Sequence, residues 1–244
     1  VGSGTLTLSG ANTYSGGTVV NGGVLSISSD GNLGSVPVSV TAASITLNSG
    51  ELLNTGSSVT LDSKRGITLG SGGGKLSSAS GTVLTTNAVI ASSGYLLTIG
   101  SIGNTGTVVL GGSSVYTGGT TVAYGTLKAG VSTSGSVTNG PFGTGTVTVS
   151  SGATLDLAGS TIANALNLSG TGYSVAALTD SVGSGVASGN VVLAADTSMG
   201  GTNSFTVGSG VMSGGFALTK VGSGTLTLSG ANTYGGATTV NAGT

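Results

Sequence analysis

The strongest constraint on the fold is a stretch near the start of the chain that returns near its end. Val1–Tyr14 is identical to Val221–Tyr234, and the ten residues after each copy share five identities. A third, looser copy lies between them at Gly106–Leu127. Internal repeats of this kind indicate stacked structural units rather than one closed globular core. The sequence therefore predicts a solenoid in which residues 1–220 form one tandem period and residues 221–244 begin the next.

A weaker similarity divides this period. Leu33–Val40 resembles Phe142–Val149 at an offset of 109 residues, and Tyr14 and Tyr116 are 102 residues apart. These correspondences predict two related halves, roughly 1–102 and 103–220. Units that contact only their neighbours tolerate such duplication, because it lengthens the stack without changing its cross-section.

Short segments that alternate aliphatic residues with Thr, Ser, Asp or Asn recur along the whole chain. This period of two is typical of half-buried β-strands, and clusters of Gly, Ser and Asn between the segments are typical of turns. Ser174–Ala187 comes nearest to a helical pattern, but its Ser, Gly and β-branched residues argue against a helix. The sequence predicts an all-β fold. The segments are Leu6–Leu8, Leu25–Ile27, Val36–Val40, Ile45–Leu47, Val59–Leu61, Ile67–Leu69, Leu97–Ile99, Val147–Val149, Leu155–Leu157, Leu166–Leu168, Phe205–Val207 and Leu226–Leu228.

The length of these segments distinguishes between all-β architectures. β-Sandwiches use longer strands and bury aromatic anchors, whereas this chain has 50 Gly in 244 residues and 4% aromatic residues. A parallel β-helix fits better, because each short strand pairs with the coil above and the interior is a narrow aliphatic column. With coils of ~20–25 residues spaced ~4.8 Å apart, one period makes about ten coils and a single rod segment of about 45–50 Å.

Composition excludes several functions. The net charge is −1, charged residues are 5% of the chain, and there is no Cys. Nucleic-acid binding requires a basic surface, and disulfides and thiolate metal sites require Cys. The mean hydropathy of +0.44 argues against disorder. No apolar run reaches a bilayer span, and the Gly-Asp-rich calcium nonapeptide is absent. Any export signal is expected to lie outside this segment. We expect no cofactor, no metal and no nucleic-acid partner.

The chemistry of the side chains also argues against an enzyme. The chain has no His, so catalytic triads built on His are impossible within it. No two carboxylates lie within ten residues of one another, and they are expected to be solvated or to cap turns; a β-helix enzyme would require the fold to cluster them. Lys64-Arg65 is expected at a loop tip beside Asp62, in a surface ion pair worth about 0–1 kcal/mol. The carboxylates are Asp30, Glu51, Asp62, Asp156, Asp180 and Asp196, with Asp156 expected to point outward.

The residues shared by the three copies form a candidate structural motif. Asn suits turns and caps backbone groups, Gly permits tight corners, and Tyr is expected to cover a coil edge with its hydroxyl in water. Stacking of a ligand on the Tyr rings is the alternative. The motif residues are Asn12, Tyr14, Gly16, Gly17, Tyr116, Gly118, Gly119, Asn232 and Tyr234.

Gly2–Ile27, which contains the phrase GTLTLSGANTY, resembles the passenger-associated transport repeat of autotransporter passenger domains. Lys64–Leu69, Gly143–Val149 and Gly152–Leu157 are similar to the same proteins. The resemblance implies a right-handed parallel β-helix that is secreted by type V secretion and displayed on the surface of a Gram-negative cell. It also implies a membrane barrel beyond this segment, which would be its only contact with the membrane.

These expectations favour a non-enzymatic structural role in a secreted fibre or stalk. The predicted partners are neighbouring copies of the same repeat, in the same chain or head to tail. A nearly uncharged surface also predicts lateral self-association into filaments or a matrix such as a biofilm. The alternative is an adhesin that binds host or surface glycans or proteins through lateral loops, which would need aromatic and polar residues to converge on one face of the rod.

Overall fold

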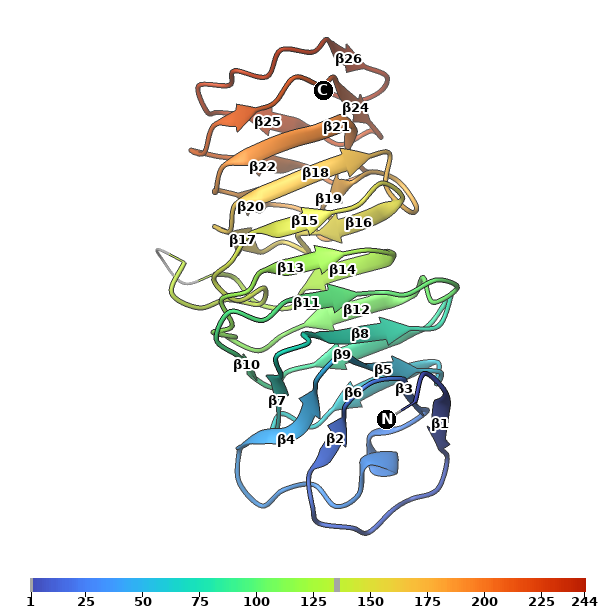
Figure 1. Cartoon of the computed structure of the whole chain (residues 1–244). Coiled ribbons are helices and arrows are strands. Elements are labelled where there is room, and N and C mark those ends of the chain that lie inside the picture. Colours follow the sequence, from blue (N-terminus) through green and yellow to red (C-terminus); the bar gives the residue numbers. More distant parts are fainter. Residues whose placement is uncertain (1, 134–136) are drawn as a thin grey trace.

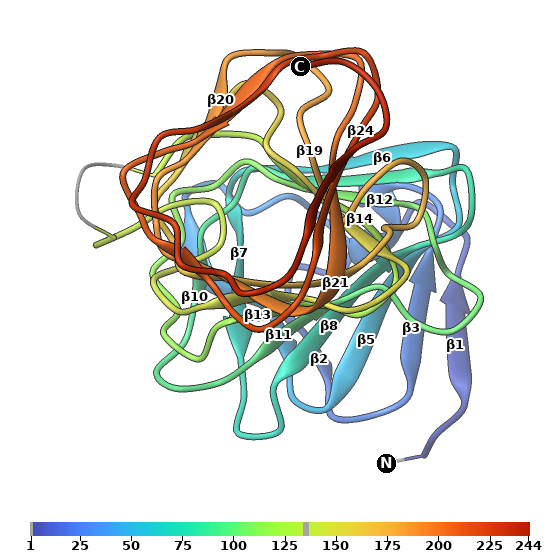
Figure 2. The ribbon, with the colours of Figure 1, turned by 90° about the horizontal axis from the view of Figure 1, so that it is seen from above.

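The chain forms a rod of stacked coils with its two ends at opposite tips (Figure 1). The computed structural model describes residues 2–133 and 137–244. Each coil visits three faces in the same order, and each strand pairs in parallel with the strand of the next coil. Viewed from the C-terminal end, the chain runs anticlockwise as it approaches the viewer, so the β-helix is right-handed (Figure 2).

The first face is a continuous ladder of ten strands. Its inward positions are aliphatic and its outward positions are mostly small or polar, because successive side chains of a strand point to opposite sides. The strands of this first ladder are β1 (Thr5–Leu8), β3 (Val24–Ile27), β5 (Gly50–Asn54), β8 (Gly74–Ser78), β11 (Leu97–Ile99), β13 (Thr120–Val122), β15 (Val147–Val149), β18 (Leu166–Gly170), β21 (Val191–Gly200) and β23 (Met212–Ser213).

The second face carries a similar ladder, which joins the first through the long strand β21. The beginning of β21 pairs with β18 and β23, and its end pairs with β19 and β24. The strands of the second ladder are β6 (Ser58–Leu61), β9 (Val83–Thr86), β12 (Thr107–Leu110), β14 (Gly125–Ala129), β16 (Ala153–Asp156), β19 (Leu178–Thr179), β24 (Leu218–Val221) and β26 (Thr238–Val240). A short 3-10 helix, η1 (Asp30–Leu33), occupies this face in an early coil.

The third face consists of two separate four-stranded sheets. Between them the chain crosses this face in longer loops, one of which carries Tyr116. The first sheet contains β2 (Thr18–Val20), β4 (Thr41–Leu47), β7 (Arg65–Leu69) and β10 (Ile90–Ala91), and the second contains β17 (Thr161–Ile162), β20 (Gly185–Ala187), β22 (Phe205–Val207) and β25 (Leu226–Leu228).

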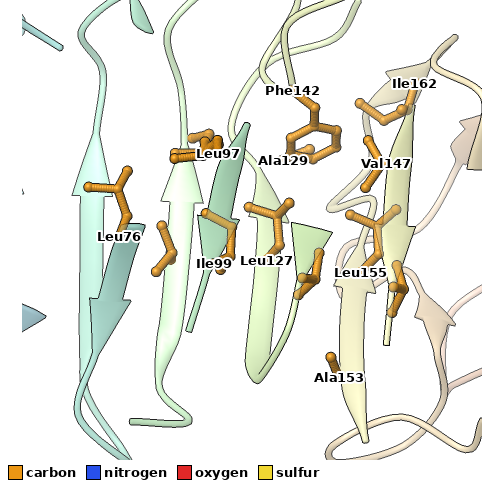
Figure 3. Close-up of a cluster of buried hydrophobic side chains, with 14 of the residues drawn as sticks. Leu76, Leu97, Ile99, Leu127, Ala129, Phe142, Val147, Ala153, Leu155 and Ile162 are labelled. Carbon is orange, nitrogen blue, oxygen red and sulfur yellow. The ribbon is translucent and has the colours of Figure 1, made fainter. Parts of the chain in front are cut away.

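The core is a set of aliphatic columns that run along the rod axis. One column on the first ladder is aligned residue by residue by the strand pairing, and all its members are buried. Figure 3 shows how such side chains, among them Leu76, Ile99 and Leu127, meet across the interior. Each buried aliphatic side chain contributes about 1.5–3 kcal/mol, so the coils are held by a continuous apolar stack. The column contains Leu25, Leu52, Leu76, Ile99, Val122, Val149, Leu168 and Leu193.

The predicted fold is confirmed: the described residues form a parallel β-solenoid without an α-helix, and its first ladder has ten strands. The coils are less uniform than expected, because one takes 19 residues from Leu6 to Leu25 and another 28 from Leu127 to Leu155. Both ladders run past residue 102 without a break, and the second ladder also runs past residue 220, where β24 pairs with β26. The division into repeat units therefore stays a prediction from sequence. No helix in the described ranges is long and apolar enough to cross a membrane.

One predicted strand is wrong. Val36–Val40 alternates like a strand but is irregular in the structure, and Val38 is 96% exposed. The counterpart of Val38–Val40 in the second half, Val147–Val149, is strand β15, with Val147 fully buried. Pro37 stands where the second half has Thr146, and a proline cannot donate a hydrogen bond to a ladder.

Candidate functional site

The three copies of the repeat share a hydrogen bond between a tyrosine and the threonine four residues later. The two hydroxyl oxygens are 3.3 Å apart in the first copy (Tyr14 and Thr18) and 2.5 Å apart in the second (Tyr116 and Thr120). In the third copy, the Tyr234 and Thr238 hydroxyls are 2.6 Å apart. We call each pair, with the turn between its residues, a Tyr–Thr corner. It lies where the chain turns into strand β2, β13 or β26.

The residue two positions before each tyrosine joins neighbouring coils. The Asn232 Oδ1 accepts a hydrogen bond from the Met212 backbone N–H at 2.9 Å, one coil back. In the second copy this residue is Ser114, whose Oγ accepts one from the Ile90 backbone N–H at 3.0 Å. Asn12 instead donates its Nδ2 to the Asn32 carbonyl of the following coil at 2.7 Å. The side chain at this position therefore satisfies backbone groups of adjacent coils.

The glycines of the motif lie where coils come closest. A Cβ on Gly118 would overlap the Tyr95 backbone of the preceding coil, and a Cβ on Gly236 would overlap that of Phe216. A Cβ on Gly119 would lie 2.8 Å from the Thr146 carbonyl oxygen of the following coil. Gly16 has nothing within 4 Å of its Cβ position, because no described coil lies against it on that side. The need for glycine thus comes from the neighbouring coil.

The following coil covers the corner with a second shared element. Gly143 has φ 63 and lies against the Tyr116 ring, while the Thr144 N–H donates to the Tyr116 carbonyl at 2.9 Å. In the first copy Gly34 has φ 75, lies against the Tyr14 ring, and is followed by the same hydrogen bond from Ser35 at 2.9 Å. A side chain at either glycine would be strained at this φ and would collide with the ring.

Tyr116 corrects the expectation that the motif tyrosines keep their hydroxyls in water. It is fully buried, and its hydroxyl is bonded to Thr120. Burial raises the pKa of the Tyr116 hydroxyl well above its ordinary value, although the Thr120 hydrogen bond acts to lower it. Tyr14 is 39% exposed because its corner is covered on one side only. The tyrosine in the middle of the rod is therefore a core residue, with no free ring face for a ligand.

The three copies start on three different faces. Strand β1 lies on the first face, β12 on the second and β25 on the third. Nine pairing steps along the first ladder lead from β1 to β23, and two further faces lead on to β25. The period of 220 residues thus spans nine coils and two faces, rather than a whole number of coils. Equivalent corners consequently point in different directions around the rod.

The prediction for Lys64-Arg65 was wrong in its details. Arg65 begins strand β7, is buried, and donates its Nε to the Asp30 Oδ1 at 2.8 Å. Its other nitrogens donate to the Leu33 and Gly34 carbonyls at 3.0 and 2.7 Å, so the guanidinium caps the end of η1. Asp62 instead accepts a hydrogen bond from the Lys64 backbone N–H.

Two carboxylates expected to be isolated lie on adjacent coils and bind backbone groups. Asp156 is outward on its strand but buried, and its Oδ1 accepts the N–H groups of Ala158 and Ser181. Asp180 accepts N–H groups at both carboxylate oxygens, including that of Gly185 at 2.6 Å. Burial acts to raise the pKa of Asp180, but four backbone hydrogen bonds outweigh it, so the pKa lies below its ordinary value. Neither carboxylate is arranged as a free acid or base.

Lys220 is a structural residue that sequence reasoning missed. It occupies an inward position of the second ladder, between Met199 and Val240, and is 3% exposed. Its Nζ donates to the carbonyls of Val221, Gly222 and Ala242 at 2.7–3.0 Å. Burial lowers the pKa of this ammonium group. The strand pattern Leu-Thr-x-Val around Lys220 does not reveal that the lysine is buried and bound to backbone carbonyls. Two of these carbonyls belong to turns, Gly222 and Ala242, and the second of them lies in the next coil.

The Tyr–Thr pairing, in contrast, could have been found from sequence. The spacing of four residues between Tyr and Thr is present in all three copies, at Tyr14, Tyr116 and Tyr234. In the described ranges, no three His, Cys, Asp or Glu residues are grouped so as to hold a metal ion. The residues that the repeat brings together are thus coil-to-coil contacts, and they define a repeat protein whose stability comes from stacking.

Comparisons with known proteins agree with this class. The family model described as the passenger-associated-transport-repeat matches residues 1–27, 104–129 and 218–244, which contain the three corners. The chain is 35% identical over 254 aligned residues to the adhesin BmaC autotransporter of Brucella suis biovar 1 (strain 1330), an alignment that covers 99% of this chain. It spans about 7% of the length of that relative. No solved structure matches. These similarities support an autotransporter passenger domain that carries three copies of this repeat.

Proposed function

We propose that the chain is a non-enzymatic rod segment of a secreted passenger at the surface of a Gram-negative cell. The observation that carries this proposal is the stack itself. Two of the three faces carry ladders that continue from coil to coil, with aliphatic columns beneath them, and the shared motif makes contacts between coils rather than a reactive site. In a β-solenoid, stability adds up from contacts between neighbours, so length can be extended without a new core.

Lateral self-association is a further part of the proposal. Of the eleven charged residues, five are buried and only Asp196 is largely exposed; the buried ones are Glu51, Arg65, Asp156, Asp180 and Lys220. The outer surface of the rod therefore carries even fewer charges than the low charged content of the sequence would suggest. Because like charges that would keep rods apart are scarce, neighbouring rods can approach along outward columns such as Thr98, Thr121 and Thr148, which the pairing aligns.

Sedimentation velocity tests this self-association. We expect species larger than the monomer as the concentration rises, with little dependence on salt. The double variant Thr121→Lys and Thr148→Lys adds charge to one outward column and should shift the distribution toward monomer. A wild-type chain that stays monomeric at high concentration would contradict lateral association, and the rod architecture would then have to act without it.

The second candidate is an adhesin, which the description of the Brucella relative favours. It requires a lateral surface that can recognise a ligand. Both functions use the same rod, because the stack holds lateral loops away from the cell. A variant of a lateral loop that keeps the rod intact but no longer binds host cells or surfaces would identify the adhesin role.

A further inference from the structure

One loop folds back over the outward side of the first ladder and forms a groove. The loop of residues 100–106 joins β11 to β12 and is longer than the corner of residues 123–124 in the next coil. The groove beneath it has a volume of about 420 Å³. It extends over five successive coils, from Val24 on β3 to Tyr124. Four of these coils supply its polar lining, beginning with Glu51 on β5 and Lys75 on β8. We call it the Tyr124 groove.

The loop buries a carboxylate at the floor of this groove. The Ser101 hydroxyl donates to the Glu51 Oε1 at 2.7 Å, across two coils, and the Asn104 Nδ2 donates to the same serine oxygen at 2.9 Å. Only 8% of the Glu51 side chain remains exposed. An exposed ion pair would contribute little and need no such cover. Here the Ser101 hydroxyl, itself held by Asn104, fixes the Oε1 atom of Glu51, and the Oε2 atom faces Lys75.

The charged atoms of the groove retain hydrogen-bonding capacity. The Lys75 Nζ lies 3.7 Å from the Glu51 Oε2, which is too far for a hydrogen bond. No hydrogen bond within the described parts of the chain occupies either atom. A hydroxyl group that enters the groove can donate to the carboxylate and accept from the ammonium group at once. The pair is neutral as a whole, so it favours an uncharged polar ligand over an anion.

Tyr124 adds an aromatic surface beside these polar groups. It is 39% exposed, and its main chain lies against Gly100, where any side chain would overlap it. Ile102, at 83% exposed, extends the apolar rim. Sugars present apolar C–H faces and a rim of hydroxyl groups, so they match an aromatic ring next to hydrogen-bonding side chains. Binding sites typically combine apolar walls with a few placed polar groups in this way.

We propose that the Tyr124 groove binds a neutral oligosaccharide that lies along the rod axis. The ring of Tyr124 stacks on one sugar, and the Glu51–Lys75 pair and Asn104 bind the hydroxyl groups of the next ones. Polar atoms from four coils line up in one direction, which suits an extended chain of several sugar units rather than a single sugar. This proposal names a ligand for the adhesin function proposed above, and it rests on that function.

The test measures binding of the 244-residue chain to an array of neutral and acidic oligosaccharides, followed by calorimetric titration with the best neutral one. We expect Tyr124→Ala and Lys75→Gln to weaken its affinity at least tenfold. Tyr95→Ala is the matched control, because Tyr95 is 37% exposed at another corner of the rod. It should bind like the wild type. All variants should keep the wild-type melting temperature, because the groove lies outside the core.

Three results would overturn the proposal: no neutral oligosaccharide binds, acidic glycans or a protein bind instead, or Tyr95→Ala loses as much affinity as Tyr124→Ala. An adhesion assay with cells that display the whole passenger distinguishes failure of the groove proposal from failure of the adhesin candidate. If these cells adhere and Tyr124→Ala does not alter adhesion, the proposed oligosaccharide site is wrong and the adhesin function stands. If they do not adhere at all, the adhesin function fails as well.

Discussion

The Tyr–Thr corner in the middle of the rod and the one near its start have the same sequence pattern but different surroundings. Tyr116 has a coil on each side and is fully buried, whereas Tyr14 has a coil on one side and is 39% exposed. Gly118 lies against the preceding coil, and the equivalent Gly16 faces open space. The difference between the two corners shows that the motif does not stabilise a coil by itself. It stabilises the junction between coils, as expected where each unit contacts only its neighbours.

Truncation of the tyrosine should separate the two corners most strongly. We expect Tyr116→Ala to lower the free energy of unfolding by about 3–5 kcal/mol, as for other buried aromatic residues. Tyr14→Ala should cost about 1 kcal/mol or less, because the ring is already partly in water. Urea unfolding followed by circular dichroism measures both values. Equal losses would show that the corner acts locally, without its neighbours.

The glycine pair gives the next largest contrast. Gly118→Ala should destabilise the chain by about 1–3 kcal/mol, because its Cβ overlaps the Tyr95 backbone and the coils must move apart. Gly16→Ala should be neutral or slightly stabilising in this chain, since alanine restricts the unfolded state more than glycine does. Thermal unfolding of the two variants checks this. A Gly118→Ala chain as stable as the wild type would disprove the close approach of the coils.

The hydroxyl pair sharpens the same comparison. Tyr116→Phe keeps the packing but removes a buried hydrogen bond, for an expected loss of about 0.5–1.5 kcal/mol. Tyr234→Phe should cost less, because its Thr238 partner lies in an exposed strand and can bond to water instead. Urea titrations of the two variants provide the comparison. A larger loss for Tyr234→Phe would contradict the role of burial.

A comparison of two carboxylates tests how stability depends on pH. The folded-state pKa of Asp180 lies below its ordinary value. Its contribution to stability is therefore complete above the unfolded-state value of about 3.9 and is lost as the pH falls through the folded-state value. Asp180→Asn should remove this acid-dependent loss, whereas Asp196→Asn, at an exposed position, should leave most of it. Melting temperatures between pH 2 and pH 7 report the difference. Identical pH profiles for wild type and Asp180→Asn would refute the assignment.

The fold could be predicted from sequence because its signals are local. Alternation of aliphatic and polar residues marked strands such as β11 and β15, and the repeat indicated stacking. Val36–Val40 failed because Pro37 prevents pairing in a segment whose alternation is otherwise perfect. The contacts between coils were harder to predict. They join residues that are 19–28 positions apart, and this spacing changes from coil to coil, so no fixed offset reveals which residues meet.

The same reasoning explains the fate of the charged residues. Arg65 and Asp30 are 35 positions apart, and Ser101 reaches Glu51 across 50 positions. Sequence spacing suggested isolated surface charges, but corner loops of unequal length cover some of them. The Tyr124 groove arises in this way. The loop of residues 100–106 is visible in the sequence, but it covers Glu51, which lies two coils earlier in the stack.

High-resolution electron cryomicroscopy of the native passenger tests the central claim most directly. If the Tyr–Thr corners join stacked coils, the map will show strands spaced about 4.8 Å apart along a rod, with 220 residues occupying about 46 Å. Successive copies of the repeat will start on different faces, two faces apart after each full period. Compact particles without this axial spacing, or copies that return to the same face after each period, would contradict the account.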